Sequence, residues 1–520
     1  MDRRTWIAIV LSVAIFIGWQ RFVLQKYQQT PTINAPAQTS VTDKPVSTDT
    51  AAVSPTRTVP VEIPAAKKIS LKNGQLAIGH SSMAIESWEY QPDPSLRKKD
   101  LEVKMSALVG TLPQLDLTVD SKDYSQLGDL VGSIKQLSDS EYEWSAENEV
   151  ARVVRKIKIS ANDGYADITY AAEFKKERPG FAFVSLVSDQ QASPDQSRDR
   201  NLVYYAGDQH RTTHASEAVK LTDVLLPVKW IGVENRYFLL AAVDLSGTAS
   251  ALLQPLAGQK NRIALVYRVS GSRIDIPVRV FFGPKSVDIL KSVHPSLDHA
   301  VEFGILSPLA YGILRFMKWL FSFSGNYGVA IILLTVALKL LLYPLTFKGA
   351  KSMKKMSVLQ PQMQKLKERY KDDKETLNRE MLLLMKNSGA NPIGGCLPML
   401  IQMPIFFALY QVLYRSFELY RAPFGLWIHD LSLHDPFYVT PVLLTVVMYF
   451  QSKLTPSTGM DPTQQKVMQA MPVIFGVFML SLPSGLTIYM LTNAVVSIIQ
   501  QIMINKKLGI QVGPVASATT

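Results

Sequence analysis

The segment Tyr327–Phe347 constrains this 520-residue chain most, because its 21 residues contain a single charged side chain, Lys339. A helix of this length measures roughly 31 Å and matches the hydrocarbon thickness of a bilayer. Further apolar segments occur at Thr5–Leu24, Leu397–Tyr414, Phe437–Gln451, Val467–Leu482 and Leu486–Ile504. The sequence therefore predicts a helical membrane protein with six spans, of which the Phe437 and Val467 segments are short enough to thin the bilayer.

The first apolar segment has two interpretations, a cleaved signal peptide and a permanent anchor. Its apolar core is followed by Gly18, Trp19, Gln20 and Arg21, which offer no small-residue cleavage site. We therefore expect residues 1–27 to form an uncleaved transmembrane anchor.

The distribution of Lys and Arg predicts the orientation of the spans. The loop Lys348–Gly395 contains eleven basic residues, whereas the loop Arg415–Pro436 contains two. Because basic loops stay on the cytoplasmic side, the larger loop is expected in the cytoplasm. With six spans, both chain ends are then cytoplasmic, including a tail at 509–520, and the roughly 300 residues before Asn326 lie outside.

The expected outer region has a linker and a β-rich domain. Residues 28–66 are rich in Thr, Ser, Ala and Pro without apolar periodicity, which is typical of a flexible linker. Residues 67–300 contain many short strand-like segments and are expected to form a β-sandwich without disulfides, since Cys396 is the only cysteine. The clearest segments are Arg152–Ile159, Tyr165–Phe174, Phe181–Val187, Arg262–Val269 and Ile274–Phe282.

Residues 301–325 predict an amphipathic helix that lies in the outer membrane interface before the second span. Its apolar face would contain Leu306, Leu309, Ile313, Phe316, Met317 and Leu320. The alternative is an ordinary helix packed on the sandwich.

Lys339 is the candidate functional residue, because a lysine near the bilayer centre costs about 2.5–3.5 kcal/mol. Polar residues share its helical stripe (Thr335, Tyr343, Thr346) and form a second stripe in the last span (Asn493, Ser497, Gln500), while Gln402 lies in the third span. Lipid offers these groups no hydrogen bonds, so we expect one polar pocket that opens to the cytoplasm. Snorkelling of Lys339 and ordinary interhelical hydrogen bonds are the alternatives.

The basic loop has apolar residues at 3–4 spacing and predicts a helical hairpin over 348–390, with Pro361 at a bend or a helix start. Anionic lipid headgroups or ribosomal RNA would suit its charge, and a solvated loop is the alternative. The basic residues expected to make contacts are Lys351, Lys354, Lys355, Lys365, Lys367 and Arg369.

The chain shows no phosphate-binding loop, no HExxH and no GxSxG, and its seven histidines form no metal-spaced pair. We therefore expect no enzyme, no cofactor and no metal. A secondary transporter or channel would also explain an intramembrane cation, although no internal repeat is visible. A glycan-binding outer domain is a further alternative.

Several motifs resemble those of the YidC/Oxa/Alb family of membrane insertases. They are NPIGGCLPMLIQMPIFFALY (Asn391–Tyr410), APFGLWIHDLSLHDPFY (Ala422–Tyr438), DPTQQKVMQAMPVIF (Asp461–Phe475), LPSGL (Leu482–Leu486) and YPLTFKGAKSMKKMSVLQPQ (Tyr343–Gln362). The anchor and the outer domain, with FFGPKSVDIL (Phe281–Leu290), are similar to the Gram-negative YidC branch. The resemblance implies a multi-domain protein: a five-helix insertase core at 326–508 with an N-terminal anchor helix, and a large periplasmic all-β supersandwich.

The resemblance also implies a function, which is to insert and help fold inner-membrane proteins, alone or with the Sec translocon, without nucleotide hydrolysis. Lys339 would attract the client into a hydrophilic groove lined by Thr335, Gln402, Asn493, Ser497 and Gln500. The family usually has Arg at 339 and often an aromatic residue at Met490. The client would slide along Met403, Phe406, Met471, Phe475, Met479 and Met490. Expected partners are nascent membrane proteins such as small ATP synthase subunits and phage coat proteins, the Sec translocon, the ribosome and anionic lipids, but not DNA.

Overall fold

The computed structural model describes most of the chain from Lys67 onward. The described residues are 67–78, 85–91, 103–104, 117–119, 132–161, 164–175, 180–189, 201–207, 209–214, 221–256, 260–371, 373–388, 392–454 and 462–509. The chain divides into two compact units, Met1–Val61 and Glu62–Thr520, and all described residues belong to the second. The predicted anchor, linker and C-terminal tail beyond Gly509 lie outside the described residues.

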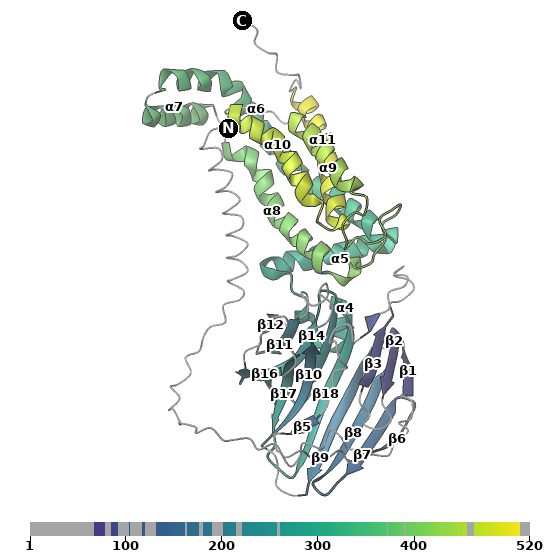
Figure 1. Cartoon of the computed structure of the whole chain (residues 1–520). Helices are drawn as coiled ribbons and strands as arrows, with labels where there is room; N and C mark the ends of the chain where they lie inside the picture. The colour runs from purple at the N-terminus through teal and green to yellow at the C-terminus, as the bar shows by residue number, and fades with distance from the viewer. Residues whose placement is uncertain are drawn as a thin grey trace, which may run out of the picture. The chain divides into compact units, whose positions relative to one another are not determined.

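A nine-stranded antiparallel sheet is the largest element of the β-rich part, which we call the β-domain (Figure 1). In spatial order its strands are β12 (Gln209–His214), β11 (Asn201–Ala206), β14 (Val228–Glu234), β15 (Phe238–Asp244), β18 (Arg273–Pro284), β9 (Tyr165–Phe174), β8 (Ala151–Ser160), β7 (Glu141–Glu147) and β6 (Ser133–Gln136). The central strands β15 and β18 pair in continuous register from Phe238↔Pro284 to Asp244↔Val278.

Two smaller sheets complete the β-domain. One has five strands in the order β13 (Thr222–Val224), β16 (Ser250–Leu256), β17 (Lys260–Arg268), β10 (Phe181–Asp189) and β5 (Leu117–Val119). The other has four, β1 (Lys67–Leu71), β2 (Gly74–Ile78), β3 (Ile85–Tyr90) and β4 (Val103–Lys104). Residues from all three sheets share one buried apolar cluster, so the sheets pack face to face. The five predicted strands are confirmed as β8, β9, β10, β17 and β18.

Strand β8 illustrates why the sequence forms this sandwich. Its side chains alternate between buried and exposed positions, with Val153 and Ile157 inside and Lys156 and Lys158 outside. The two lysines form cross-strand ion pairs with Glu143 and Glu141 on β7, at 3.2 and 3.0 Å. The period of two therefore fixes which face enters the core.

The C-terminal part is helical, and we call it the bundle. It begins after the short elements α4 (Val287–Val293), η3 (Pro295–Ala300) and η4 (Gly304–Leu306). Its helices are α5 (Ser307–Ser324), α6 (Tyr327–Arg369), α7 (Lys374–Asn387), α8 (Pro392–Arg415), η5 (Phe417–Leu419), α9 (Val439–Leu454), α10 (Pro462–Met479) and α11 (Ser484–Leu508). The predicted architecture of an all-β domain followed by a helical core is confirmed.

Helix α5 confirms the helix expected before the second span, and the residues of its predicted apolar face have two environments. Ile313, Met317 and Leu320 are buried, whereas Leu309 and Phe316 are exposed. The helix also exposes Trp319 and Phe323, and the Trp319 ring lies next to the rings of both Phe316 and Phe323. Thus α5 has two apolar faces, one packed on protein and one facing outward.

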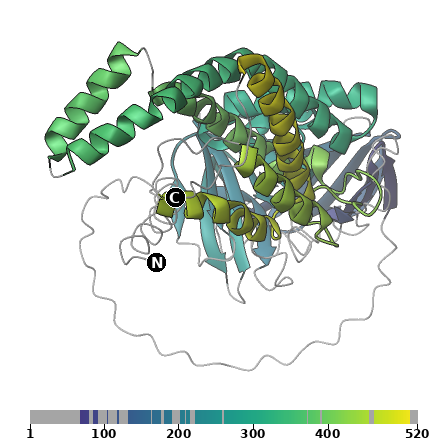
Figure 2. The ribbon, with the colours of Figure 1, turned by 90° about the horizontal axis from the view of Figure 1, so that it is seen from above.

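Helix α6 is longer than the predicted span. Asn326 caps its start by accepting hydrogen bonds from the backbone N–H groups of Gly328 and Val329. The helix then continues through Pro344 and Pro361 to Arg369, so Pro361 begins no helix. The end of α6 and the returning α7 lie side by side as a hairpin (Figures 1 and 2).

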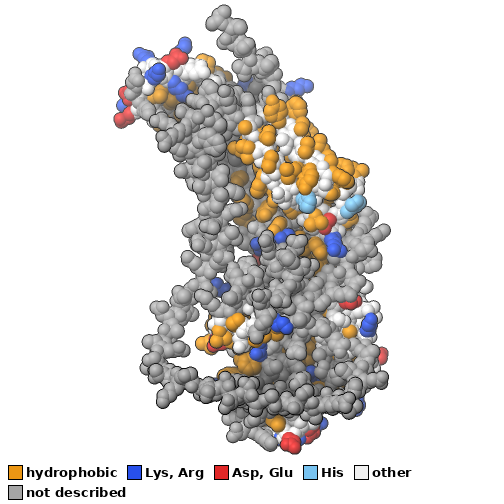
Figure 3. All heavy atoms as spheres, in the orientation of Figure 1, with side chains coloured by type: hydrophobic (Ala, Val, Ile, Leu, Met, Phe, Trp, Pro, Cys, Tyr) orange, Lys and Arg blue, Asp and Glu red, His pale blue; other side chains and the backbone are white. Residues whose placement is uncertain are grey.

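The bundle carries apolar side chains on its outside. In the described residues, α6 and α11 are long and apolar enough to cross a membrane by length and composition, and shorter apolar helical stretches occur at Val439–Ser452 and Ala470–Met479. Only 28% of the most apolar window of α6 is buried in the protein. The visible face of the bundle is accordingly rich in hydrophobic side chains, while charged ones gather at the hairpin (Figure 3). Such a surface suits lipid better than water.

Candidate functional site

Lys339 joins helices α6 and α11 from inside the bundle. Its ammonium donates a hydrogen bond to the hydroxyl of Ser497 at 2.7 Å, and that hydroxyl donates to the Asn493 carbonyl at 2.6 Å. The amide of Gln500 donates to the backbone carbonyl of Lys339 at 3.0 Å. Within the part of the chain that the structure describes, no acidic side chain forms an ion pair with Lys339. Its charge is therefore held by neutral groups alone.

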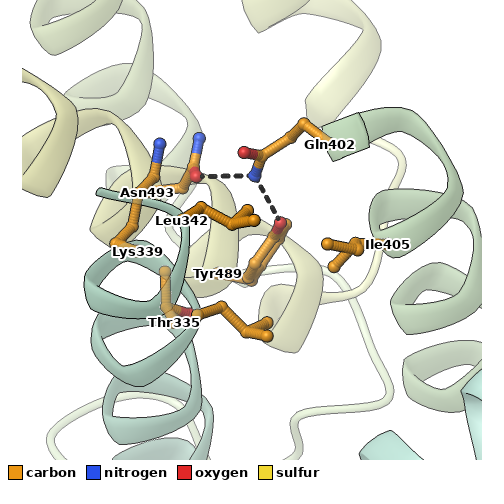
Figure 4. A pocket seen from close by; sticks show the side chains of 8 residues that line it. Thr335, Lys339, Leu342, Gln402, Ile405, Tyr489 and Asn493 are labelled. Atoms are coloured by element: carbon orange, nitrogen blue, oxygen red, sulfur yellow. Dashed lines mark hydrogen bonds between the residues drawn. The ribbon is translucent and has the colours of Figure 1, made fainter. Parts of the chain in front are cut away.

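Helix α8 contributes the third wall through Gln402. The Gln402 side-chain N–H₂ group donates to the amide oxygen of Asn493 at 3.1 Å and to the Tyr489 hydroxyl at 3.3 Å (Figure 4). Thr335 lies below them on α6, where its hydroxyl donates to the Ile331 carbonyl at 2.7 Å. The structure thus brings together the six predicted polar residues, which we call the polar groove: Thr335, Lys339, Gln402, Asn493, Ser497 and Gln500.

The polar groove has two compartments, and Lys339 lines both of them. The first is a narrow cleft lined by Thr335, Leu338, Lys339, Leu342, Gln402, Ile405, Tyr489 and Asn493 (Figure 4). The second is a cavity of about 170 Å³ lined by Lys339, Thr346, Gln451, Ser497, Gln500 and Gln501. A polar cavity of this size holds several water molecules. Lys339 therefore stands where a roomier amide-lined cavity meets a tight cleft.

An apolar plug lies between the polar groove and the β-domain. Its members are fully or almost fully buried and come from three helices: Ala330, Ile331 and Leu334 of α6, Ala408, Leu409 and Val412 of α8, and Leu486 and Ile488 of α11. The plug ends one turn before Lys339, at Leu334 and the buried Thr335. The polar path is therefore closed on the side of the β-domain.

The residues expected to guide a client differ in exposure. Met403 and Met471 are exposed on α8 and α10, and Phe406, Phe475 and Met490 are half-buried. Met479 is different, because it is buried against Leu444 and Ala494 between α9 and α11. Met479 therefore offers no surface along which another chain can move.

The basic residues of the hairpin are mostly directed outward. Lys351, Lys355, Lys365, Lys367 and Arg369 are exposed. Lys354 is half-buried and donates to the backbone carbonyl of Leu508, the last residue of α11. Lys354 thus ties the hairpin to the end of the bundle, whereas the side chains of the other five reach the surface.

The sequence analysis missed six residues that line the two compartments: Leu338, Leu342, Ile405, Gln451, Tyr489 and Gln501. It also placed Tyr343 on the polar stripe, but Tyr343 lines neither compartment and lies next to the Phe347 ring at 6.3 Å. Among the described residues, no group of three His, Cys, Asp or Glu side chains is arranged to hold a metal ion.

Comparison with known proteins identifies the family of these two parts. The sequence profile described as 60Kd inner membrane protein matches residues 319–511, which cover the bundle. The profile described as YidC periplasmic domain matches residues 135–319, which cover most of the β-domain. The chain belongs to the YidC family. The resemblance inferred from the motifs of the sequence is therefore confirmed.

Two YidC relatives show the extent of the similarity. The membrane protein insertase YidC of Geobacter sulfurreducens is 45% identical over 284 residues, which cover 54% of this chain and 53% of the relative. That of Helicobacter pylori is 40% identical over 276 residues, which cover 53% of this chain and 50% of the relative. The chain thus spans about half the length of these known YidC relatives.

Solved YidC structures align over a longer range at lower identity. The crystal structure of an active YidC insertase with its first transmembrane domain resolved covers 84% of this chain and 92% of its own, with 20% identity and a TM-score of 0.38. YidC from Thermotoga maritima covers 84% and 98%, with 17% identity and a TM-score of 0.28. The assignment to the YidC family rests on the sequence matches.

Proposed function

We propose that this protein inserts short membrane proteins into a bilayer and helps them fold, without hydrolysing nucleotides. The observation that carries the proposal is Lys339, a cation on an apolar helix with hydrogen bonds to neutral groups and no acidic partner among the described residues. A charge in such a place costs free energy, so its presence indicates a functional role. The relatives are named membrane protein insertases, which agrees with that use.

The proposed mechanism starts with attraction of the client's acidic or polar leader to Lys339. The 170 Å³ cavity and its glutamine amides replace part of the water that the leader loses, which lowers the cost of bringing it into the membrane. The short helices α9 and α10 thin the bilayer and shorten the path.

The client's apolar segment then leaves the polar groove sideways into lipid. Met403, Phe406, Met471, Phe475 and Met490 supply an adaptable apolar surface for this step. Removal of apolar area from water contributes about 25 cal/mol per Å², which is enough to drive the movement without ATP.

The cellular setting follows from the same proposal. The bundle lies in the inner membrane with the hairpin and both chain ends in the cytoplasm, and the β-domain lies in the periplasm. The exposed basic residues of the hairpin would contact anionic lipids or the ribosome. Clients would include small ATP synthase subunits and phage coat proteins, with or without the Sec translocon.

The test is insertion of a small two-span client with an acidic leader into liposomes that contain only this purified protein. Protease protection of the client above the level of empty liposomes is the expected result. Solute flux through the same liposomes, with no protection, would instead support a transporter. An inactive but folded protein would contradict autonomous insertion.

A series at Lys339 tests the role of the charge. Lys339→Arg keeps insertion, and Lys339→Ala lowers it about tenfold, which corresponds to about 1.4 kcal/mol of lost attraction. Lys158→Ala, an exposed lysine of the β-domain, is the matched control and leaves insertion unchanged. Equal insertion of the acidic-leader client by Lys339→Ala would defeat the charge-attraction mechanism.

A further inference from the structure

A buried carboxylate, Glu418, lies where the β-domain meets the bundle. It sits on η5, directly after α8, and its side chain is 6% exposed. Its Oε1 atom accepts a hydrogen bond from Ser286 at 3.1 Å and pairs with the Lys318 ammonium of α5 at 2.8 Å. Lys318 also pairs with Asp288 of α4 at 2.7 Å. One carboxylate thus connects α5, η5 and the last segment of the β-domain.

The residues around Glu418 strengthen this connection with aromatic packing. Phe417 belongs to the buried core of the β-domain, where its ring lies edge-on to Phe238 at 5.6 Å. Tyr420 stacks on Tyr237 at 4.2 Å, and Arg236 donates to the Tyr414 hydroxyl at 2.7 Å. The loop after α8 is therefore inserted into the β-domain and does not merely rest against it.

Both helices that Glu418 connects continue into walls of the polar groove. Helix α8 runs back from Arg415 to Ile405 and Gln402, which line the narrow cleft. Helix α5 passes through Gly325 and Asn326 directly into α6, which carries Thr335 and Lys339. The Asn326 amide also donates to the Phe424 carbonyl at 2.7 Å, so the β-domain ends of both walls are fixed at two points.

The apolar plug lies between these fixing points and the polar groove. It consists of closely packed side chains of α6, α8 and α11 without hydrogen bonds of its own to hold the helices in place. A small separation of α6 from α8 would open such a plug, since the attraction between apolar side chains falls steeply when the gap between them grows by about an ångström. The ionic and aromatic contacts at the β-domain end are the groups that resist this separation.

We propose that Glu418 is a positioning residue that keeps the polar groove closed on the side of the β-domain. Through Lys318 and Ser286 it holds the ends of α8 and α5–α6 against α4, and the apolar plug stays shut. The β-domain thereby acts as a brace for the groove. The inference rests on the proposed insertase function, which gives a reason for a groove closed on one side. Its test does not require insertion activity.

The test measures access to the polar groove from each side of the membrane. In a Cys396→Ser background, Gln451→Cys, which lies in the 170 Å³ cavity of the polar groove, is placed in oriented proteoliposomes and exposed to a membrane-impermeant maleimide from one side at a time. With Glu418 present, we expect labelling from the hairpin side only. With Glu418→Ala, we expect labelling from the β-domain side to increase at least about tenfold. Glu418→Gln keeps an acceptor for Ser286 but loses the charge, and gives a smaller increase.

The matched control is Glu234→Gln. Glu234 forms a buried ion pair with Lys285 at 2.7 Å, and both residues belong to the β-domain. It should leave the labelling pattern unchanged. If Glu418→Ala fails to fold, Lys318→Met breaks the same pair from α5 and should also open the groove.

Unchanged labelling in a folded Glu418→Ala protein would overturn the proposal. Equal opening by Glu234→Gln would also overturn it, because the effect would then be a general loosening. The wild-type protein could fail to insert clients although it is labelled from the hairpin side only and Glu418→Ala is labelled from both sides. That combination would count against the proposed function alone.

Discussion

The β-domain and the bundle place their apolar residues in opposite ways. In the β-domain the largest apolar side chains, such as Trp144, Trp230 and Phe238, are fully buried. In the bundle Leu341, Phe450 and Val477 are mostly exposed, and the polar side chains of the groove are inside. The first pattern is that of a protein folded in water, and the second is that of one folded in lipid.

The two regions also treat buried charge differently. Glu234 and Lys285 of the β-domain neutralise each other at 2.7 Å. Lys339 of the bundle has hydrogen bonds to neutral groups only, among the residues that the structure describes. A paired charge supports a fixed structure, whereas an unneutralised one attracts a ligand of opposite sign. The comparison agrees with the proposed roles, in which the β-domain is a stable support and the unneutralised cation of the bundle attracts a client.

The largest expected effect is in the core of the β-domain. Leu240 is fully buried on β15, between Val233 and Phe282 of the neighbouring strands. Leu240→Ala should lower the free energy of unfolding by about 2–5 kcal/mol, because it leaves a cavity in the packed core. Chemical denaturation of the full chain in detergent, followed by tryptophan fluorescence, measures this change.

The control for this substitution is Leu225→Ala. Leu225 follows β13 and is 89% exposed, so its truncation should change the unfolding free energy by less than about 0.5 kcal/mol. Similar losses for the two variants would mean that burial does not decide stability in the β-domain, and the contrast with the bundle would fail.

A smaller effect is expected where α9 and α10 approach in the bundle. A Cβ atom at Gly476 would lie 1.8 Å from the Thr445 hydroxyl oxygen, which donates to the Pro441 carbonyl at 2.9 Å. Small residues let membrane helices pack closely. Gly476→Ala should therefore cost about 1–3 kcal/mol through overpacking. Thermal denaturation in detergent gives the loss, and adding Thr445→Ala should recover part of it.

The β-domain supplies the matched control for Gly476. Gly180 precedes β10, and a Cβ atom there would have no neighbour within 4 Å. Gly180→Ala should leave the melting temperature unchanged. Wild-type stability of Gly476→Ala would show that the two helices adjust freely, and close packing would then not distinguish the bundle.

Much of the fold follows from periodicity and length. The strand pattern located β9 as Tyr165–Phe174, and the apolar segment at Tyr327 located the start of α6. The sequence did not predict that α6 continues through Pro361, because a proline inside a helix costs free energy but does not always end the helix. The outward face of α5 did not follow either, since a sequence shows which residues are apolar but not which face meets protein.

The polar groove was largely predictable because polar residues are rare in apolar spans. Thr335, Lys339 and Gln402 therefore stood out from their neighbours. Tyr489 did not, since an aromatic residue in such a span is ordinary until a partner like Gln402 is found at its hydroxyl. The sequence did not predict the burial of Met479 either, because the neighbouring helices decide which faces of a helix are covered by protein.

The smallest expected effect lies at the connection between the two regions, at Glu302. Its carboxylate pairs with His210 of β12 at 3.2 Å, and its backbone carbonyl accepts from Arg415 of α8 at 2.9 Å. Burial alone would raise the pKa of Glu302, but the hydrogen bond and charge of His210 and the charge of Arg415 outweigh it and lower the pKa. A lowered pKa adds stability above the ordinary value of about 4.5, and this stability is lost as the pH falls through the lowered value.

Glu302→Gln tests this contribution, which should be at most about 1 kcal/mol because the side chain is partly exposed. The wild-type protein should melt at a higher temperature than the variant at pH 6, and the difference should shrink to zero in acid, below the pKa of the folded protein. Glu149→Gln, at an exposed turn, is the control for removal of a surface carboxylate. A difference that stays constant from pH 6 into acid would mean that the charge of Glu302 does not stabilise the connection, and the aromatic contacts around Phe417 would then hold the two regions together.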